Sequence, residues 1–227
     1  MEGEQKKETR FLNMISPEAG EYLLKSGTMI QRKRGERIFE EKEEGSPLYF
    51  LLEGYASLYR SSRYGEDRIL MVCAAGDLLN ESSIEGSRTP AAAEALSDVK
   101  LLSVDRETFA AMLEGNFALM QAVCRSLSVK ASRLYHQLGN ANGTYPLEKR
   151  LAARLLRLSK EYGSDTREGR RIGFKVTVSF LANLLGAKRE SVSRYMSGLK
   201  KKGYIRHKEG MLTVTDPEGL RAFLDME

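Results

Sequence analysis

Residues 186–205, GAKRESVSRYMSGLKKKGYI, combine six basic residues and one acid with regularly spaced apolar residues. A solvated surface helix usually carries mixed charge, and a core helix rarely carries cations. Placing successive residues 100° apart puts the apolar residues on one face of a helix and a polar row on the opposite face. The apolar face contains Val192, Tyr195, Met196 and Leu199, and the polar row contains Glu190, Arg194, Ser197 and Lys201, flanked by Arg189 and Ser193.

The polar row has the hydrogen-bonding groups that read base edges in the major groove of DNA. Arginine donates to guanine, and a carboxylate accepts from the N4 amino group of cytosine. Lys200, Lys201 and Lys202 can neutralise phosphates near the end of the helix. We therefore predict a helix that binds double-stranded DNA. The alternative is a three-helix bundle with a solvated charged face.

The sequence also predicts the elements that must position this helix. Residues 178–186, VSFLANLLG, form a preceding helix with Thr177 as its N-cap and Gly186 as its terminator. The second helix begins near Lys188. Residues 204–216 then read as two short strands around a Lys-Glu-Gly turn. A hairpin that follows two such helices predicts a winged helix-turn-helix domain.

A longer helix with a heptad pattern precedes this domain. After Gly115-Asn116, apolar residues recur at alternating spacings of three and four, over about 24 residues or about 36 Å of helix. This narrow stripe favours pairing with a second copy of the chain, and packing on the helix's own domain is the alternative. Leu119 and Val123 form a second apolar strip, so the helix can pair with a second copy on one side and pack on its own domain on the other. The predicted dimer seam comprises Phe117, Met120, Cys124, Leu127, Ala131, Leu134 and Leu138.

Short β-type segments separated by turn residues dominate the chain before this helix. Residues 11–27 read as short helical pieces, and β-type runs begin at Thr28. Regularly spaced short strands predict a small antiparallel barrel or roll. Downstream, the polar segment 139–144 breaks the long helix and suits a hinge. The stretch 147–163 reads as another amphipathic helix, and a polar loop runs from there to Ile172.

The charge balance differs between the two halves of the chain. Residues 141–227 hold 18 Lys and Arg against 10 Asp and Glu, whereas residues 1–140 hold 18 against 21. The basic excess behind the net charge of +5 therefore lies after residue 140. Halves of opposite sign indicate two domains with different partners, one of them a polyanion.

Composition argues against several classes of protein. The sequence has no run of about 18 uninterrupted apolar residues, so we expect no membrane helix. The charged residues 1–10 lack the apolar segment of a secretory signal, and we expect a cytoplasmic protein with reduced thiols. No Ser-His-Asp spacing, HExxH motif or phosphate-cradling loop is found, so we do not expect an enzyme.

Several segments, in order along the chain, carry a family resemblance. They are GERIFEEKEEGSPLYFLLEGYASLY, the turn at GEDRIL, AAGDLLNESS, RLAARLLRL and LANLLGAKRESVSRYMSGLKKKGYI. In the last of them an R-E-x-V-x-R core stands at Arg189, Glu190, Val192 and Arg194. Over nearly its whole length the chain resembles the CRP/FNR family of bacterial transcription regulators. In that family these segments are the first β-roll strands and their turn, the approach to the effector cassette, the first helix of the DNA-binding domain and the recognition element.

The resemblance implies an α+β fold in three parts. These are an effector-binding antiparallel β-roll, jelly-roll-like, over residues 1–115, a dimerisation helix over residues 116–140 and a winged helix-turn-helix domain over residues 141–227. An effector bound in the roll would shift the helix pair and reorient the DNA-binding domains. Two recognition helices about 34 Å apart would read an imperfect palindrome. RNA polymerase is a further partner that the resemblance implies.

The resemblance also assigns roles to single residues of the recognition element. It implies base contacts by Arg189, Glu190 and Arg194. It places Lys188, Ser191 and Ser193 at or near the DNA backbone. The predicted DNA-binding residues are Lys188, Arg189, Glu190, Ser191, Ser193, Arg194 and Lys201.

Effector residues are implied by the resemblance alone. Cyclic-nucleotide-binding members carry a Gly-Glu pair for the ribose and an Arg-Ser/Thr pair for the phosphate. Here Glu81 matches, but Asn80 replaces the glycine, and Arg88-Thr89 follows at a shorter interval. These departures, with Lys130 at a base-contacting position, fit a small anionic effector better than cyclic AMP. Three alternatives stay open: a cyclic nucleotide as effector, redox sensing, and activity without any effector. The predicted effector-binding residues are Asn80, Glu81, Ser82, Arg88, Thr89, Lys130 and Ala131.

No metal, haem or iron–sulfur cluster is expected. The chain has two cysteines, whereas an iron–sulfur cluster takes about four. His136 and Cys73 could each donate a haem ligand, but a lone histidine near a helix end is usually a surface residue. Cys124 could meet its copy across a dimer as a redox switch, although buried cysteine is usually a small apolar residue.

One alternative function belongs to another class of protein. The chain could be a ligand-binding dimerisation module whose C-terminal helices dock protein rather than DNA. Salt separates the two, because DNA binding through Lys and Arg weakens steeply as salt rises.

Overall fold

The structure, a computed structural model, describes residues 10–61, 67–141 and 145–225. These residues form two compact units: one holds residues 10–61 and 70–137, and the other holds residues 67–69, 138–141 and 145–225. Most of the charged start of the chain, the first two residues of GEDRIL and the end of the predicted hinge lie outside the described residues.

The first unit is built on an antiparallel β-roll, as predicted. One of its sheets has the strand order β1-β7-β3, and the other has the order β2-β6-β4-β5. The strands are β1 (Thr28–Arg32), β2 (Arg37–Phe39), β3 (Leu48–Glu53), β4 (Tyr55–Ser61), β5 (Asp67–Ala74), β6 (Ala92–Ala95) and β7 (Val99–Val104).

Apolar side chains and one glycine explain the path of these strands. Leu48, Phe50 and Leu101 are fully buried, so β3 and β7 face the interior of the roll. Gly54 joins β3 to β4 with φ of 89°, and a Cβ there would lie 2.3 Å from the backbone oxygen of Asp98. Only glycine fits this turn, because a side chain would meet both the positive φ and the facing backbone.

Helices close one end of the roll. They are the short 3₁₀ helix η1 (Phe11–Asn13), α2 (Pro17–Ser26) and α3 (Arg106–Glu114). The rings of Phe11 and Phe109 each pack against Phe50 of β3, with centroid separations of 5.5 Å. The sequence reading did not predict α3, although Asp105 marks its start by accepting a hydrogen bond from the Thr108 amide at 3.1 Å.

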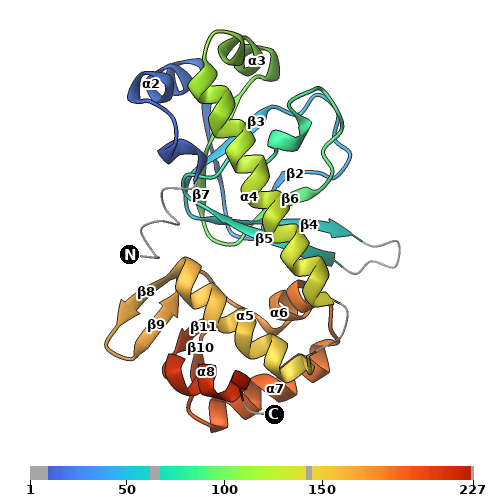
Figure 1. The fold of residues 1–227 in the computed structure, drawn as a ribbon, viewed down its shortest axis with the longest axis vertical. Helices are drawn as coiled ribbons and strands as arrows, with labels where there is room; N and C mark the ends of the chain where they lie inside the picture. Colours follow the sequence, from blue (N-terminus) through green and yellow to red (C-terminus); the bar gives the residue numbers. More distant parts are fainter. Residues whose placement is uncertain (1–9, 62–66, 142–144, 226–227) are drawn as a thin grey trace. The chain divides into compact units, whose positions relative to one another are not determined.

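The long helix α4 (Phe117–Ala141) lies along the roll (Figure 1). It begins where predicted, and the Asn116 side chain caps it by accepting from the Leu119 amide at 2.9 Å. Leu119, Ala122 and Val123 are buried in the same core as Phe50. The helix extends through Gly139 to Ala141, so the predicted break at residues 139–144 begins later than expected.

The second unit contains helices around a four-stranded antiparallel sheet with the order β10-β11-β9-β8. None of the helices within the described ranges is long and apolar enough to span a membrane. The elements are α5 (Leu147–Tyr162), β8 (Gly163–Thr166), β9 (Gly169–Ile172), α6 (Val178–Leu185), α7 (Arg189–Lys201), β10 (Ile205–Lys208), β11 (Met211–Val214) and α8 (Pro217–Asp225).

One local prediction in this unit was wrong. The segment up to Ile172, expected to be a polar loop, is the hairpin β8–β9. Its sequence has no apolar alternation, and its strands form because β9 pairs with β11, with Arg171 opposite Thr213. A distant strand therefore decides the structure of a segment whose own residues favour a loop.

The two thiols of the chain lie in opposite environments, which leads to a testable difference. Cys73 is buried in the core of the roll, and burial raises the pKa of its thiol to about 12. Because the thiolate is the reactive form, Cys73 in a Cys124→Ser variant should resist iodoacetamide at pH 8 until the protein unfolds. Mass spectrometry of labelled peptides along a urea titration tests this. Rapid labelling in native buffer would contradict the buried position.

Candidate nucleic-acid interface and effector cassette

The first helix of the predicted helix-turn-helix, α6, has the expected cap and terminator. The Thr177 hydroxyl accepts a hydrogen bond from the Phe180 amide at 3.0 Å. Gly186 ends the helix in the left-handed conformation, with φ of 60°. The buried Leu181 and Leu185 attach α6 to the interior of its unit.

The second helix, α7, divides into the two faces that the sequence predicts. Val192, Met196 and Leu199 are buried and pack α7 against α5 and α6. The opposite face therefore points to solvent. Its exposed members are Arg189, Glu190, Ser193, Arg194, Ser197 and Lys201; Lys188, just before α7, is also exposed, and Ser191 is half-buried.

Tyr195 holds the side chain of Arg194 in place. The Arg194 guanidinium lies 5.0 Å from the centre of the Tyr195 ring, and its Nη2 donates to the tyrosine oxygen at 3.4 Å. Tyr195 is half-buried at the border of the apolar face. A half-buried ring under a guanidinium restricts the directions in which the arginine can extend.

The three lysines at the end of α7 are not equivalent. All three are exposed. The Lys202 ammonium, however, lies 4.2 Å from the centre of the Phe223 ring and 4.0 Å from the Glu148 carboxylate. It therefore has partners within its own domain, which distinguishes it from Lys201 on the polar row.

The predicted wing is a tight hairpin of β10 and β11. Lys208 pairs with Met211, so the loop between them has two residues. Glu209 and Gly210 both have positive φ, 53° and 81°, as a type I′ turn requires. This turn matches the twist of the strands and projects the exposed Lys208 at the tip.

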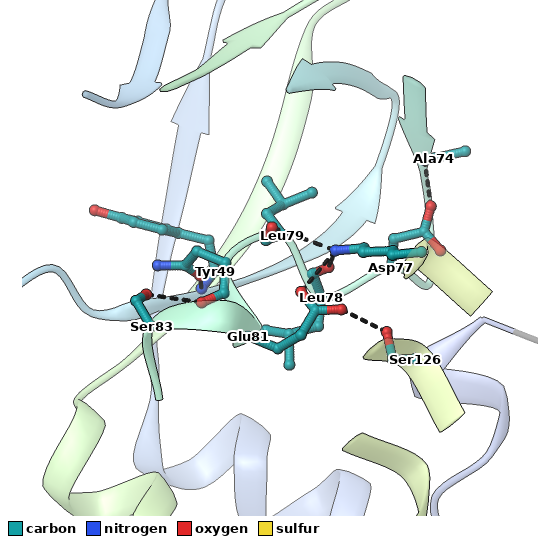
Figure 2. A network of polar contacts seen from close by, with 10 residues as sticks. Tyr49, Ala74, Asp77, Leu78, Leu79, Glu81, Ser83 and Ser126 are labelled. Carbon is teal, nitrogen blue, oxygen red and sulfur yellow. Dashed lines mark hydrogen bonds and ion pairs between the residues drawn. The ribbon is translucent and has the colours of Figure 1, made fainter. Parts of the chain in front are cut away.

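The predicted effector cassette follows β5 and contacts α4. Glu81 begins the 3₁₀ helix η2 (Glu81–Ser83) and is 3% exposed. Ser126 of α4 donates its hydroxyl to Glu81 Oε1 at 2.6 Å (Figure 2). Lys130, one helical turn further along α4, donates to Glu81 Oε2 at 2.6 Å. A buried carboxylate thus receives one donor on each oxygen.

Lys130 is held by three acceptors. Besides Glu81, its ammonium donates to the backbone oxygens of Leu78 at 2.6 Å and Leu79 at 3.3 Å. Burial favours a lower pKa for Lys130, but the Glu81 carboxylate, with Cys73 and Asp77 nearby, outweighs burial and raises the pKa. The lysine therefore stays charged inside the fold.

The other predicted effector residues fall into two groups. Asn80 joins Glu81: its Oδ1 accepts from the Tyr49 amide at 3.0 Å and its Nδ2 donates to the Pro47 oxygen at 2.8 Å. Arg88 and Thr89 lie instead with the acidic loop at residues 40–44. The Arg88 Nε donates to Glu44 at 2.7 Å, and the Thr89 hydroxyl donates to the Glu40 oxygen at 2.5 Å. Ser82 is exposed, and Ala131 is half-buried.

Ser126 and Asp77 are polar residues of this cassette that the sequence reading missed. The Asp77 carboxylate accepts from the Ala74 amide at 2.8 Å, and burial raises the pKa of Asp77 (Figure 2). Ser126 and Lys130 continue the buried strip of α4 after Leu119 and Val123, at helical spacing. A lysine in a buried strip requires a carboxylate partner, and this signal could have connected α4 with Glu81.

The outer face of α4 carries most of the predicted dimer seam. Phe117 is 76% exposed, Leu127 is 38% exposed and Leu138 is 66% exposed. Met120 and Cys124 are also exposed, so from Phe117 to Leu127 the described residues of the first unit leave these seam side chains open to solvent. Two members differ: Leu134 packs against the core of the roll, and Ala131 is half-buried.

The candidate metal and haem ligands of the chain lie apart from one another. In the part of the chain that the structure describes, no three His, Cys, Asp or Glu side chains are grouped to hold a metal ion. His136 is exposed and Cys73 is buried, so this pair does not share an environment.

Comparison with protein families and known proteins agrees with this arrangement. Residues 29–116 match the family model of the cyclic nucleotide-binding domain, and residues 149–223 match that of the Crp-like helix-turn-helix domain. The first range holds the β-roll and the cassette, and the second holds α6, α7 and the wing.

Similar proteins extend the match along most of the chain. A CRP-like cAMP-activated global transcriptional regulator of Mycobacterium tuberculosis is 26% identical over 91% of this chain and 92% of its own length. A cyclic AMP receptor protein of Thermus thermophilus is 29% identical over 81% and 82%. The crystal structure of a CRP/FNR-family transcriptional regulator from Thermus thermophilus, 25% identical, superposes with a TM-score of 0.71 over 88% of this chain and 99% of its own. The chain therefore belongs to the CRP/FNR family of transcriptional regulators.

Proposed function

We propose that the protein is a homodimer whose two copies of α7 bind an imperfect DNA palindrome, under the control of a small effector that acts on the β-roll and is not cyclic AMP. The observation that carries the DNA-binding role is the division of α7. Val192, Met196 and Leu199 anchor one face, so Arg189, Glu190 and Arg194 project together from the other. This arrangement fits a helix lying in the major groove.

The exposed seam of α4 supports the dimer. Large apolar side chains such as Phe117 and Leu127 are rarely left in a row on the surface of a monomer. A copy of the same helix offers a matching stripe, and packing at heptad spacing would cover both. Because each chain has one α7, dimerisation supplies two recognition helices for two half-sites.

The effector side of the proposal rests on the cassette. The match to a cyclic nucleotide-binding domain supports control by a small molecule. Two relatives are named for cyclic AMP. In this chain Lys130 is bound to Glu81, and Arg88 is bound to Glu44. The Arg88 pair is exposed and weak, so it is the covered Lys130–Glu81 pair that favours an effector of another kind. We further propose that the protein acts in the cytoplasm, where a regulator of this family meets DNA and RNA polymerase.

A salt titration tests the DNA-binding role against protein docking. Fluorescence anisotropy with labelled duplex, first random and then selected from a pool by the protein, gives affinity at rising salt. DNA binding through several cations should fall linearly on a logarithmic plot, with a slope near −0.9 for each phosphate contact. Absence of duplex binding at low salt would reject the proposal.

Arg194 and Lys201 should lose different parts of DNA binding. Arg194→Ala should cost about 1–3 kcal/mol on the selected site and relax one base preference, because it removes a base-edge donor. Lys201→Ala should weaken binding to all sequences alike and reduce the salt slope by about one. Anisotropy on selected and random duplex measures both. Equal losses for Arg194→Ala on the two duplexes would contradict base reading.

Leu127 should be needed for the dimer. Leu127→Asp places a charge in the middle of the apolar seam, where pairing would bury it without a partner. We expect a monomer in sedimentation velocity, and weaker DNA binding as a consequence. Ser132→Asp, at an exposed position of α4 outside the seam, is the matched control and should stay dimeric. An intact Leu127→Asp dimer would refute the seam.

A further inference from the structure

We infer that the Lys130 ammonium acts as an internal ligand of the effector cassette: it binds Glu81 from within the chain, at the carboxylate that a nucleotide ribose would contact. In this way Lys130 determines the effector specificity of the protein, because it closes the cassette to cyclic nucleotides. The inference deepens the proposed function, because it concerns the effector side of the same regulator. It rests on three properties of the cassette: each Glu81 oxygen already accepts a hydrogen bond from within the chain, each Lys130 hydrogen has an acceptor, and the Glu81 side chain is buried.

Both oxygens of the Glu81 carboxylate accept hydrogen bonds from within the chain. One oxygen receives the Ser126 hydroxyl at 2.6 Å, and the other receives the Lys130 ammonium at 2.6 Å. The Glu81 side chain is 1% exposed. Lone pairs remain on both oxygens, but the carboxylate is covered, so a sugar hydroxyl could reach it only by displacing a donor or the side chains packed around it.

The Lys130 ammonium has an acceptor for each of its hydrogens. It has three hydrogens and three acceptors, namely the Glu81 carboxylate and the backbone oxygens of Leu78 and Leu79. A ligand phosphate could gain a hydrogen bond from it only at the expense of one of these contacts. The lysine is therefore a structural cation of the fold, and it leaves no charge available for an anion.

Opening the pair would be costly. Removing one partner of a buried ion pair leaves the other charge uncompensated, which shifts an equilibrium by about a hundred- to a thousand-fold. A cyclic nucleotide that bound through Glu81 or Lys130 would lose affinity by about this factor. The neighbouring Asn80 offers no exposed substitute, because it is 2% exposed and its Oδ1 and Nδ2 already bind the Tyr49 amide and the Pro47 oxygen.

The same contacts tie α4 to the roll. Ser126 and Lys130 are four residues apart and face the cassette, whereas Cys124 and Leu127 lie on the exposed side. Two anchors one turn apart fix the rotation of a helix about its axis. The internal ligand thus sets the face that α4 presents to a second copy, without any small molecule.

Chemical rescue tests the internal ligand directly. Lys130→Ala removes the ammonium with three methylene groups, which propylammonium replaces. In Lys130→Ala, propylammonium chloride should raise the thermal midpoint saturably above the value in equal tetramethylammonium chloride, which has no N–H donor. Wild type and Lys130→Ala/Glu81→Gln should show no such difference. Equal effects of the two salts on Lys130→Ala would overturn the inference.

A double-mutant cycle covers the case in which Lys130→Ala does not fold. Lys130→Met should lower the folding equilibrium constant about a hundred- to a thousand-fold. Lys130→Met/Glu81→Gln removes both charges and should be more stable than Lys130→Met. Lys100→Met, which breaks the exposed pair with Glu53, is the matched control and should cost about five-fold at most. A double variant less stable than Lys130→Met would overturn the pairing.

Nucleotide binding by the unmodified chain tests the specificity. Millimolar cyclic AMP or cyclic GMP should leave the thermal midpoint of the wild type unchanged. A rise in the midpoint that disappears in Glu81→Gln would overturn the inference, because it would show that the nucleotide reaches the carboxylate. None of these measurements uses DNA, so failure of the proposed DNA binding is distinguishable from failure of the internal ligand.

Discussion

The buried ion pair between Lys130 and Glu81 is the constraint on which the arrangement of the first unit depends. A charge inside a fold must be paired and hydrogen-bonded, because leaving it alone costs several kcal/mol. Here the partners come from segments almost fifty residues apart, the loop after β5 and the middle of α4. Satisfying both charges therefore forces the helix against the cassette, and Ser126 adds a second contact on the same carboxylate.

This constraint gives α4 two distinct faces. The inner face is apolar near the start of the helix, at Leu119 and Val123, and polar further along, at Ser126 and Lys130. The outer face carries exposed apolar side chains, among them Phe117, Met120 and Leu127. One helix thus touches the cassette on one side and carries the predicted dimer seam on the other. A change at the cassette that rotated α4 would change the seam directly, without a chain of intermediates.

The second unit uses the same division of a helix into faces. Buried Val192 and Leu199 hold α7, and the exposed face carries the side chains suited to DNA. Local contacts then distinguish residues of similar type. The Arg194 guanidinium lies over the ring of Tyr195, whereas the Lys202 ammonium lies over the ring of Phe223 in its own domain. Membership of the CRP/FNR family is consistent with a conserved plan of roll, long helix and winged helix-turn-helix across low sequence identity.

The sequence by itself determined the features that depend on local pattern. The 3.6-residue period located α7 and the start of α4, Thr177 and Gly186 marked the ends of α6, and the short β-type runs indicated an antiparallel roll. Only the tertiary structure decided which polar groups meet. Pairing with β11 made a hairpin of the segment expected to be a loop, and the fold paired Lys130 with Glu81, which the sequence pattern did not indicate. The physical reason is that periodicity is a property of neighbours along the chain, whereas strand pairing and charge compensation depend on residues that are distant in sequence.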